Sequence, residues 1–148
     1  MPVDDLIRRA GLRVTDTRRA VYEALRALPH ARADDVGAAL REVVPATSMQ
    51  SVYNALGDFV EAGLVRRIEP AGHPGLYELR VDDNHHHLVC SLCGRVEDVD
   101  CVVGPSPCLR PAQTHGFAVQ VAEVTFWGIC PECGQESTAP HGAPPPDP

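Results

Sequence analysis

The chain has 148 residues, of which 44% are hydrophobic, and a formal net charge of −7. This length suits one ordinary hydrophobic core, or two small cores that a metal ion or a partner stabilises. No apolar run of signal-peptide length opens the sequence, and nowhere do about 18 apolar residues follow one another, so we expect a cytoplasmic protein with no membrane partner.

The charges are unevenly distributed along the chain. Residues 1–80 contain 11 Arg against 11 Asp and Glu, whereas residues 81–148 contain 2 Arg against 9 Asp and Glu. Lysine is absent, so every basic residue is arginine. Arginine binds phosphates and guanine edges well, although a genome rich in G and C codons would produce the same preference. The acidic net charge therefore does not exclude a nucleic-acid partner for the N-terminal half.

The N-terminal 63 residues have the apolar spacing of short amphipathic helices. Thr15 can cap a first helix that runs to about Leu28, with Val21, Leu25 and Leu28 on its inward face, and Pro29 ends it.

Two more helices follow. The second runs from Ala33 to Val44, before Pro45, and the third begins after Ser48 and stops at Gly63. The residues expected to face inward are Val36, Leu40 and Val43 in the second helix, and Val52, Leu56, Phe59 and Val60 in the third.

A β-hairpin follows the helices, because residues 64–81 form two apolar-rich strands around a Pro/Gly turn. Three helices and a hairpin predict a winged helix-turn-helix domain over residues 1–81. From His85 onward, short Val-rich runs alternate with turns and predict a small sheet over residues 85–136. The expected fold class is therefore α+β.

Three segments are expected to lack regular structure. Asp82 to Asn84 is the expected hinge between the two domains. Three prolines in residues 104–111 predict a loop. Residues 137–148 are expected to form a disordered tail.

Two C-x-x-C pairs, Cys90/Cys93 and Cys130/Cys133, are the strongest chemical signal in the chain. Four thiolates can surround one zinc ion tetrahedrally, and a site with no open position is structural. Gly94 and Gly134, each directly after a pair, permit the tight turn that such a site needs. The alternatives are two redox dithiols or chance pairs.

A histidine triplet precedes the first cysteine pair. Alternate residues of a strand share a face, so His85 and His87 can point together while His86 points away. Glu78, Asp98 and His30 are compatible partners for a divalent ion, and such nitrogen and oxygen ligands suit Fe(II), Mn(II), Zn(II) or Ni(II). A solvated loop is the alternative for the triplet.

The third helix leaves an outward face that is typical of a DNA-recognition helix, although an ordinary solvated face is the alternative. Arg13, Arg18 and Arg19, at the start of the preceding helix, could reach phosphates or a minor groove. The outward residues of the recognition helix are Ser48, Gln50, Ser51, Tyr53 and Asn54.

Four segments, LRVTDTRRAVYEAL, SVYNALGDFVEAGLVRRIE, DNHHHLVCSLCGRVEDVD and WGICPECG, together resemble the ferric uptake regulator family in order and spacing. The resemblance covers roughly residues 5–134. It implies a winged-helix domain followed by an α/β dimerisation domain, in a homodimer whose metal-loaded form binds AT-rich inverted repeats. DDNHHHLVC and VDCVVGPSPCL look most like the peroxide-responsive branch, which represses catalase-peroxidase genes.

The resemblance also implies roles for individual residues. It makes Cys90, Cys93, Cys130 and Cys133 the structural zinc ligands. It makes His30, Glu78, His85, His87 and Asp98 the regulatory metal ligands. An additional sensory site of some members is only partly represented, by His86, His115 and Glu123.

The expected function is a metal-dependent repressor, not an enzyme, in which Fe(II) at the regulatory site holds the dimer on operator DNA until peroxide oxidises a ligand histidine. Oxidation of Cys101 and Cys108 to a disulfide is a rival route. A second hypothesis is a regulator of iron, zinc or nickel supply without peroxide chemistry.

Two other classes of protein fit less well. A zinc hydrolase would need a catalytic motif such as H-E-x-x-H, which the chain lacks. A zinc-ribbon interaction module would leave the N-terminal helices unexplained.

Overall fold

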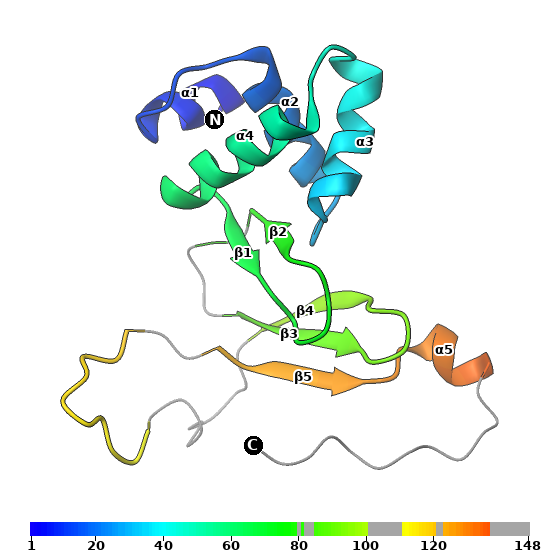
Figure 1. Cartoon of the computed structure of the whole chain (residues 1–148). Coiled ribbons are helices and arrows are strands. Elements are labelled where there is room, and N and C mark those ends of the chain that lie inside the picture. The colour runs from blue at the N-terminus through cyan, green and yellow to red at the C-terminus, as the bar shows by residue number, and fades with distance from the viewer. Residues whose placement is uncertain (80, 82–84, 101–110, 121–122, 137–148) are drawn as a thin grey trace. The chain divides into compact units, whose positions relative to one another are not determined.

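The computed structural model describes residues 1–79, 81, 85–100, 111–120 and 123–136, which form two compact units divided between Asp83 and Asn84 (Figure 1). Helices and a β-hairpin form the N-terminal unit, and a three-stranded sheet followed by a short helix forms the C-terminal unit. The predicted α+β class, with a winged helix-turn-helix first, is confirmed. The expected hinge and tail, and nearly all of the expected proline-rich loop, lie outside the described residues.

The N-terminal unit has one helix more than the sequence pattern predicts. This helix, α1 (Val3–Arg9), precedes α2 (Asp16–Ala27), α3 (Ala33–Val43) and α4 (Met49–Glu61). The Thr15 hydroxyl accepts a hydrogen bond from the backbone N–H of Arg18 at 3.1 Å, and Ser48 caps α4 in the same way through Ser51. These caps satisfy N–H groups that a helix end otherwise leaves without partners.

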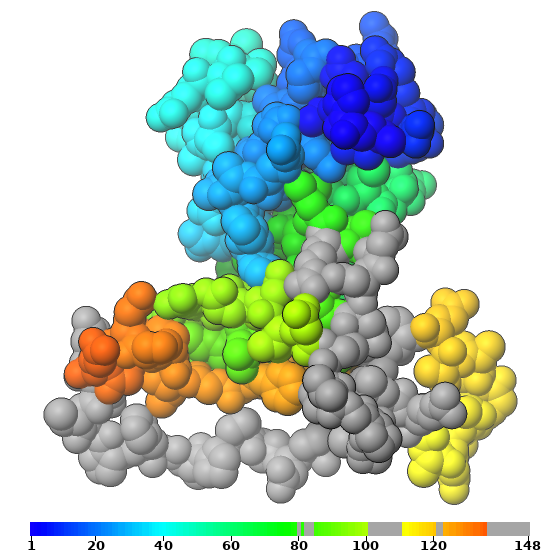
Figure 2. Space-filling model, turned by 180° about the vertical axis from the view of Figure 1, so that it is seen from behind, coloured from blue at the N-terminus to red at the C-terminus, as the bar shows by residue number. Residues whose placement is uncertain are grey.

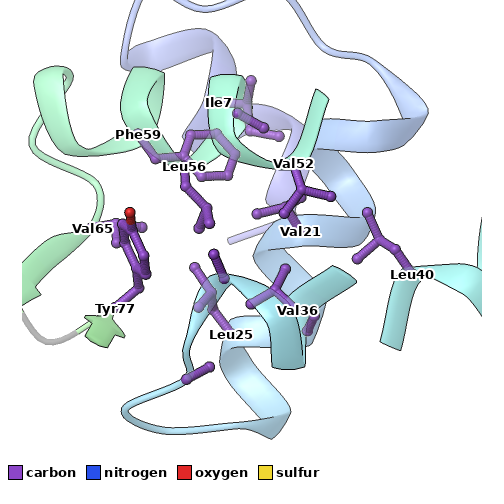
Figure 3. Close-up of a cluster of buried hydrophobic side chains, with 14 residues drawn as sticks. Ile7, Val21, Leu25, Val36, Leu40, Val52, Leu56, Phe59, Val65 and Tyr77 are labelled. Carbon is purple, nitrogen blue, oxygen red and sulfur yellow. The ribbon is translucent and has the colours of Figure 1, made fainter. Parts of the chain in front are cut away.

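The core of this unit lies where the four helices meet (Figure 3). Phe59 and Leu56 of α4 are fully buried, as are Ile7 of α1 and Val21 of α2. The Phe59 ring meets the ring of Tyr22 edge-on, with centroids 6.2 Å apart. Because α4 supplies the largest of these side chains, the packing holds α4 against α2 and leaves its opposite face exposed.

Two residues predicted to face inward are exposed instead. Leu28 is 38% exposed and Val43 is 73% exposed. Leu28 is the residue directly after α2, and Val43 is the last residue of α3. The apolar stripe of each helix continues to its end, but the core stops about one turn earlier, so these predictions were wrong.

The wing is an antiparallel pair, β1 (Arg66–Ile68) and β2 (Leu76–Glu78), in which Arg66 lies opposite Glu78. A second contact ties β2 to the turn before α3. Ala31 and Tyr77 exchange two backbone hydrogen bonds, of 3.2 and 2.8 Å. The hairpin is therefore joined to the helices through its backbone as well as through the buried side chain of Tyr77.

The C-terminal unit is a sheet of β3 (His85–Cys90), β4 (Val96–Asp100) and β5 (Thr125–Gly128), followed by α5 (Pro131–Glu136). The strand order is β4-β3-β5, with β3 antiparallel to β4 and parallel to β5. Gly94, with φ of 77°, forms the turn from β3 to β4. Figure 2 shows α5 (orange) at one end of this sheet and residues 111–120 (yellow) at the other.

None of the described helices combines the length and the apolar character that crossing a bilayer requires.

Replacing Phe59 by alanine tests the importance of α4 in the core. Loss of this buried ring should lower the free energy of unfolding of the N-terminal unit by about 3–5 kcal/mol. Urea unfolding followed by far-UV circular dichroism measures the change. The control is Val43→Ala, which should change stability by less than about 0.5 kcal/mol because Val43 is exposed. Equal effects of the two variants would contradict this description of the core.

Candidate metal centres and nucleic-acid interface

The four cysteines of the C-x-x-C pairs converge at one end of the C-terminal sheet. All four Sγ atoms lie within 4.8 Å of one another, and those of Cys93 and Cys130 are 3.7 Å apart. Tetrahedral zinc with Zn–S bonds of about 2.3 Å places its sulfur ligands about 3.8 Å apart. The cluster therefore fits a zinc ion with four protein ligands, which is a structural site.

Strand pairing explains why these cysteines meet. The parallel register places Cys90, the last residue of β3, beside Gly128, the last residue of β5, and the Ser91 N–H donates to the Gly128 carbonyl at 2.8 Å. Each pair then turns back on itself. Gly94 forms the expected tight turn, whereas Gly134 lies within α5 and its N–H donates to the Cys130 carbonyl at 2.9 Å.

The pKa values of two of the thiols are also consistent with a cation site. The backbone N–H groups of Cys130 and Cys93 stabilise the thiolate of Cys90 and lower its pKa to about 6. Hydrogen bonds shared with Cys130 and then with Cys93 raise the pKa of Cys133. Cys133 therefore keeps its proton beside the Cys90 thiolate, and a dication that binds the cluster must displace that proton.

Within the N-terminal unit, His30 lies next to Glu78. The His30 Nε2 is 3.2 Å from the Glu78 Oε2, and Arg66 Nε lies 3.9 Å from the other carboxylate oxygen. His30 adopts a left-handed backbone conformation, with φ of 57°, directly before the Ala31–Tyr77 bridge. This bridge fixes the two side chains together, because it joins the residue after His30 to the residue before Glu78.

Within the C-terminal unit, one carboxylate faces two histidines. The Nε2 atoms of His85 and His87 are both 3.4 Å from Asp98 Oδ1, and the two imidazole rings lie 4.8 Å apart between centroids. The register explains this arrangement, since Asp98 lies directly opposite His87 and His85 shares the face of His87. Two nitrogens and one carboxylate on a single face form a set of candidate metal ligands.

The residues of the additional sensory site do not gather in the same way. His86 is buried and meets Phe126, with ring centroids 6.3 Å apart, whereas His115 and Glu123 are exposed. Across the described part of the chain, these three residues do not come close enough together to form a group of metal ligands. Cys101 and Cys108, the candidate redox pair, lie outside the described residues.

The outward face of α4 has the composition expected for a recognition helix. Gln50, Tyr53 and Asn54 are exposed, and the Gln50 Nε2 donates to the Asn54 Oδ1 at 2.9 Å. The first turn of α4 contains no acidic residue, in contrast to the first turns of α1, α2, α3 and α5. The positive end of the α4 dipole is therefore not neutralised within its own first turn.

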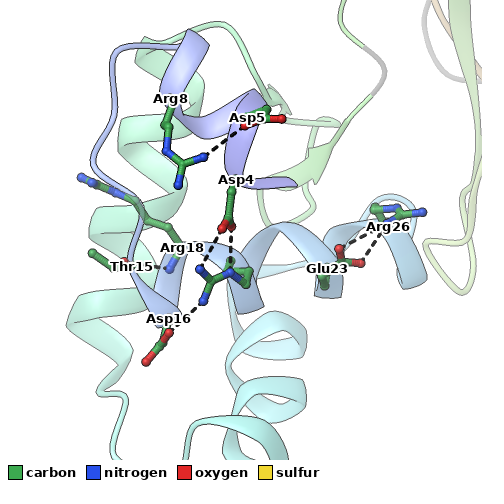
Figure 4. A network of polar contacts seen from close by, with 9 residues as sticks. Asp4, Asp5, Arg8, Thr15, Asp16, Arg18, Glu23 and Arg26 are labelled. Atoms are coloured by element: carbon green, nitrogen blue, oxygen red, sulfur yellow. Dashed lines mark hydrogen bonds and ion pairs between the residues drawn. The ribbon is translucent and has the colours of Figure 1, made fainter. Parts of the chain in front are cut away.

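Two of the three predicted phosphate-binding arginines are engaged within the protein. Figure 4 shows part of this network, with dashed contacts on the carboxylates of Asp4 and Asp16 and between Arg18 and Thr15. Arg18 pairs with Asp58 of α4 at 2.5 Å and donates to the Arg13 carbonyl at 2.7 Å. Arg19 binds Asp4 at 2.8 Å, and its hydrogen bond lowers the pKa of that carboxyl group. Asp58 was not foreseen, because no local pattern predicts an ion pair between residues forty positions apart.

A winged helix-turn-helix joined to a unit with a four-cysteine zinc site defines a metal-binding transcription regulator. Residues 9–127 match the Ferric uptake regulator family, and the chain belongs to that family. Members of this family regulate transcription.

Individual relatives agree with this assignment. The chain is 48% identical to the transcriptional regulator FurA of Mycobacterium tuberculosis over 133 residues, which cover 90% of both chains. It is 50% identical to the ferric uptake regulation protein 1 of Mycolicibacterium fortuitum over 122 residues, covering 82% of this chain and 76% of the relative.

Among solved structures, the Campylobacter jejuni peroxide stress regulator is 25% identical to this chain, with a TM-score of 0.63. The match covers 90% of this chain and 100% of that structure.

Replacing Cys133 by serine tests the four-cysteine site. We expect the variant to lose its zinc and the C-terminal sheet to unfold, because binding of a structural zinc contributes on the order of 10 kcal/mol to folding. Native mass spectrometry measures the zinc content, and circular dichroism measures the sheet. Ser91→Ala, an exposed change beside the cluster, is the control and should retain one zinc. A Cys133→Ser protein with one tightly bound zinc would contradict the assignment.

Proposed function

We propose that the chain is an Fe(II)-dependent repressor of peroxide-defence genes that releases its operator when hydrogen peroxide oxidises the regulatory site. The observation that carries this proposal is the pair of histidines directed at Asp98. Nitrogen and carboxylate ligands suit Fe(II) and Mn(II), and they differ from the all-sulfur ligands of the zinc site. The four thiols would hold a permanent zinc ion, and the nitrogen and carboxylate ligands would hold an exchangeable one.

We assign to the regulatory ion the ligand pair of the N-terminal unit, His30 and Glu78, and the three ligands of the C-terminal unit, His85, His87 and Asp98. The support comes from inside each unit, where the structure brings these side chains within hydrogen-bonding range. Ligands drawn from both domains would make DNA binding depend on occupancy by the metal. Zn(II) and Ni(II) suit the same ligands, and availability in the cell selects among the ions.

In this proposal α4 enters the major groove of double-stranded operator DNA. Short polar side chains and Tyr53 contact the base edges, and Ser48 and Ser51 lie at the end of the helix that faces the phosphates. The exposed Arg13 supplies one phosphate contact, and Arg19 supplies another where a phosphate displaces its partner Asp4, whereas Arg18 holds α4 in place through Asp58.

A homodimer completes the proposal. Strand β5 is an edge of the described sheet, and all four of its residues are exposed, including the large apolar Phe126 and Trp127. An exposed edge strand can pair with a strand of another chain. In a two-fold dimer the same strand of a second copy provides the matching surface. Two recognition helices in one dimer fit an inverted repeat.

A regulator of metal supply is the second candidate, and the name of the M. fortuitum relative favours it. Under that alternative, a chelator would release the DNA but peroxide would not. Under the peroxide proposal, both treatments release the DNA when the ion is Fe(II), and peroxide fails when Mn(II) replaces it. Gel-shift assays on the DNA upstream of the protein's own gene separate the two candidates.

Replacing His85 by alanine tests the regulatory site. Metal-dependent operator binding should fall to the level of the metal-free protein, because one of the nitrogens directed at Asp98 is lost. One tightly held zinc per chain should remain, as measured by native mass spectrometry. His73→Ala, in the hairpin turn, is the control and should behave like the unmodified protein. If His85→Ala also removed the zinc, the division into two separate sites would be wrong.

Mass spectrometry of the Fe(II)-loaded protein treated with peroxide tests the sensing chemistry. Reaction at the bound iron should add the mass of one oxygen atom to the peptide that contains His85 and His87. Protein loaded with Mn(II) is the control and should gain no oxygen. A disulfide between Cys101 and Cys108, with unmodified histidines, would instead favour the thiol route.

A further inference from the structure

The outward stripe of α4 is uncharged over its first two turns. Gln50, Tyr53, Asn54 and Gly57 are exposed at helical spacing, opposite the buried Val52. The first charged residue of the helix is Asp58, which pairs with Arg18. Side-chain amides therefore supply most of the hydrogen-bonding capacity that this stripe offers to a base.

The two amides are joined to each other. The Gln50 Nε2 donates to the Asn54 Oδ1 at 2.9 Å, which is the usual contact of residues four apart on a helix. Each amide has one acceptor oxygen and one NH2 group, so the pair uses one half of each. The Gln50 oxygen, an acceptor, and the Asn54 NH2 group, a donor, are the halves that this bond does not use.

We infer that Gln50 and Asn54 act as one unit that reads an adenine in each half-site. In the major groove, adenine presents the N7 acceptor and the N6 amino donor, which amide side chains bind in pairs. The Asn54 NH2 group donates to N7, and the Gln50 oxygen accepts from N6. This inference rests on the proposed function, in which α4 lies in the major groove.

Guanine is excluded by the same two groups. At guanine, the O6 acceptor takes the place of the N6 donor, so it would face the Gln50 oxygen with no proton between them. The Gln50–Asn54 hydrogen bond also limits the rotamers of both side chains before DNA binds, which reduces the entropy lost on binding.

The Ser48 and Ser51 hydroxyls offer less to a base. Their oxygens lie 3.0 Å apart and within hydrogen-bonding distance, and Ser48 also accepts from the Ser51 N–H. The cap therefore uses much of their hydrogen-bonding capacity, and the amide pair is the better candidate for base recognition.

The test begins by selecting DNA with the full-length protein, loaded with zinc and Mn(II), from random duplexes. In the selected duplex, each adenine is then replaced in turn by 7-deazaadenine, which keeps the base pair but has a C–H in place of N7. For the unmodified protein, one such replacement per half-site should weaken binding by about 10-fold, because one base contact is lost.

Asn54→Asp identifies the residue that makes this contact. Aspartate has the shape of asparagine but no NH2 donor, so this variant should bind the selected duplex and its 7-deaza form with equal affinity. Glu61→Gln is the matched control, since it also exchanges a carboxylate and an amide at an exposed position of α4, and it should keep the 10-fold difference.

The outcomes separate this inference from the proposed function. If no duplex is enriched, the proposed function fails and the inference fails with it. If a duplex is enriched but no 7-deaza replacement weakens binding, or Asn54→Asp keeps the difference, the protein reads DNA by other contacts and the inference alone is overturned.

Discussion

Four thiols within 4.8 Å of one another cannot all ionise without a cation among them, and the C-terminal unit depends on that constraint. The sheet has only three described strands, and β5 is exposed along its whole length, so apolar burial contributes little to holding β3 beside β5. A zinc ion shared by residues next to both strands supplies that link. The same strand β3 carries His85 and His87, so the structural ion also helps to hold the strand on which the histidine face lies.

The two sets of metal ligands differ in how their parts are held. The four cysteines, all from one unit, would surround a zinc ion and leave it no open position. The histidines and carboxylates proposed as ligands of the regulatory ion come in two preassembled groups, one organised by the Ala31–Tyr77 bridge and the other by the β3–β4 register. Each group by itself offers fewer ligands than the four thiols of the zinc cluster. Such an arrangement suits an ion that exchanges with the solution, so that its occupancy follows the concentration or the oxidation state of the metal.

Features that depend on neighbouring residues in the sequence, such as strand alternation and C-x-x-C spacing, could be predicted. Contacts between residues far apart in the sequence could not. Strand alternation placed His85 and His87 on one face, and the C-x-x-C spacing predicted the cysteine cluster. Helix α1 was missed, because seven residues with few apolar positions show little periodicity. The partners of Arg18 and Arg19 could not be predicted, since Asp58 and Asp4 lie on other helices. A contact between Gln50 and Asn54 was foreseeable from their spacing of four. Which amide donates, and therefore that the Gln50 oxygen and the Asn54 NH2 group are not used by this bond, is known only from the structure.

The parallel pairing of β3 with β5 affects how the chain must fold. The β3–β4 hairpin closes a short turn at Gly94, whereas His87 reaches its partner Thr125 only after the intervening chain has been ordered or looped out. Loop closure over such a distance carries a larger entropic cost and slows the step. We therefore expect the second cysteine pair to join the first one late in folding. A newly made chain would need zinc to complete its C-terminal unit, so scarcity of zinc would limit how much functional regulator a cell can assemble.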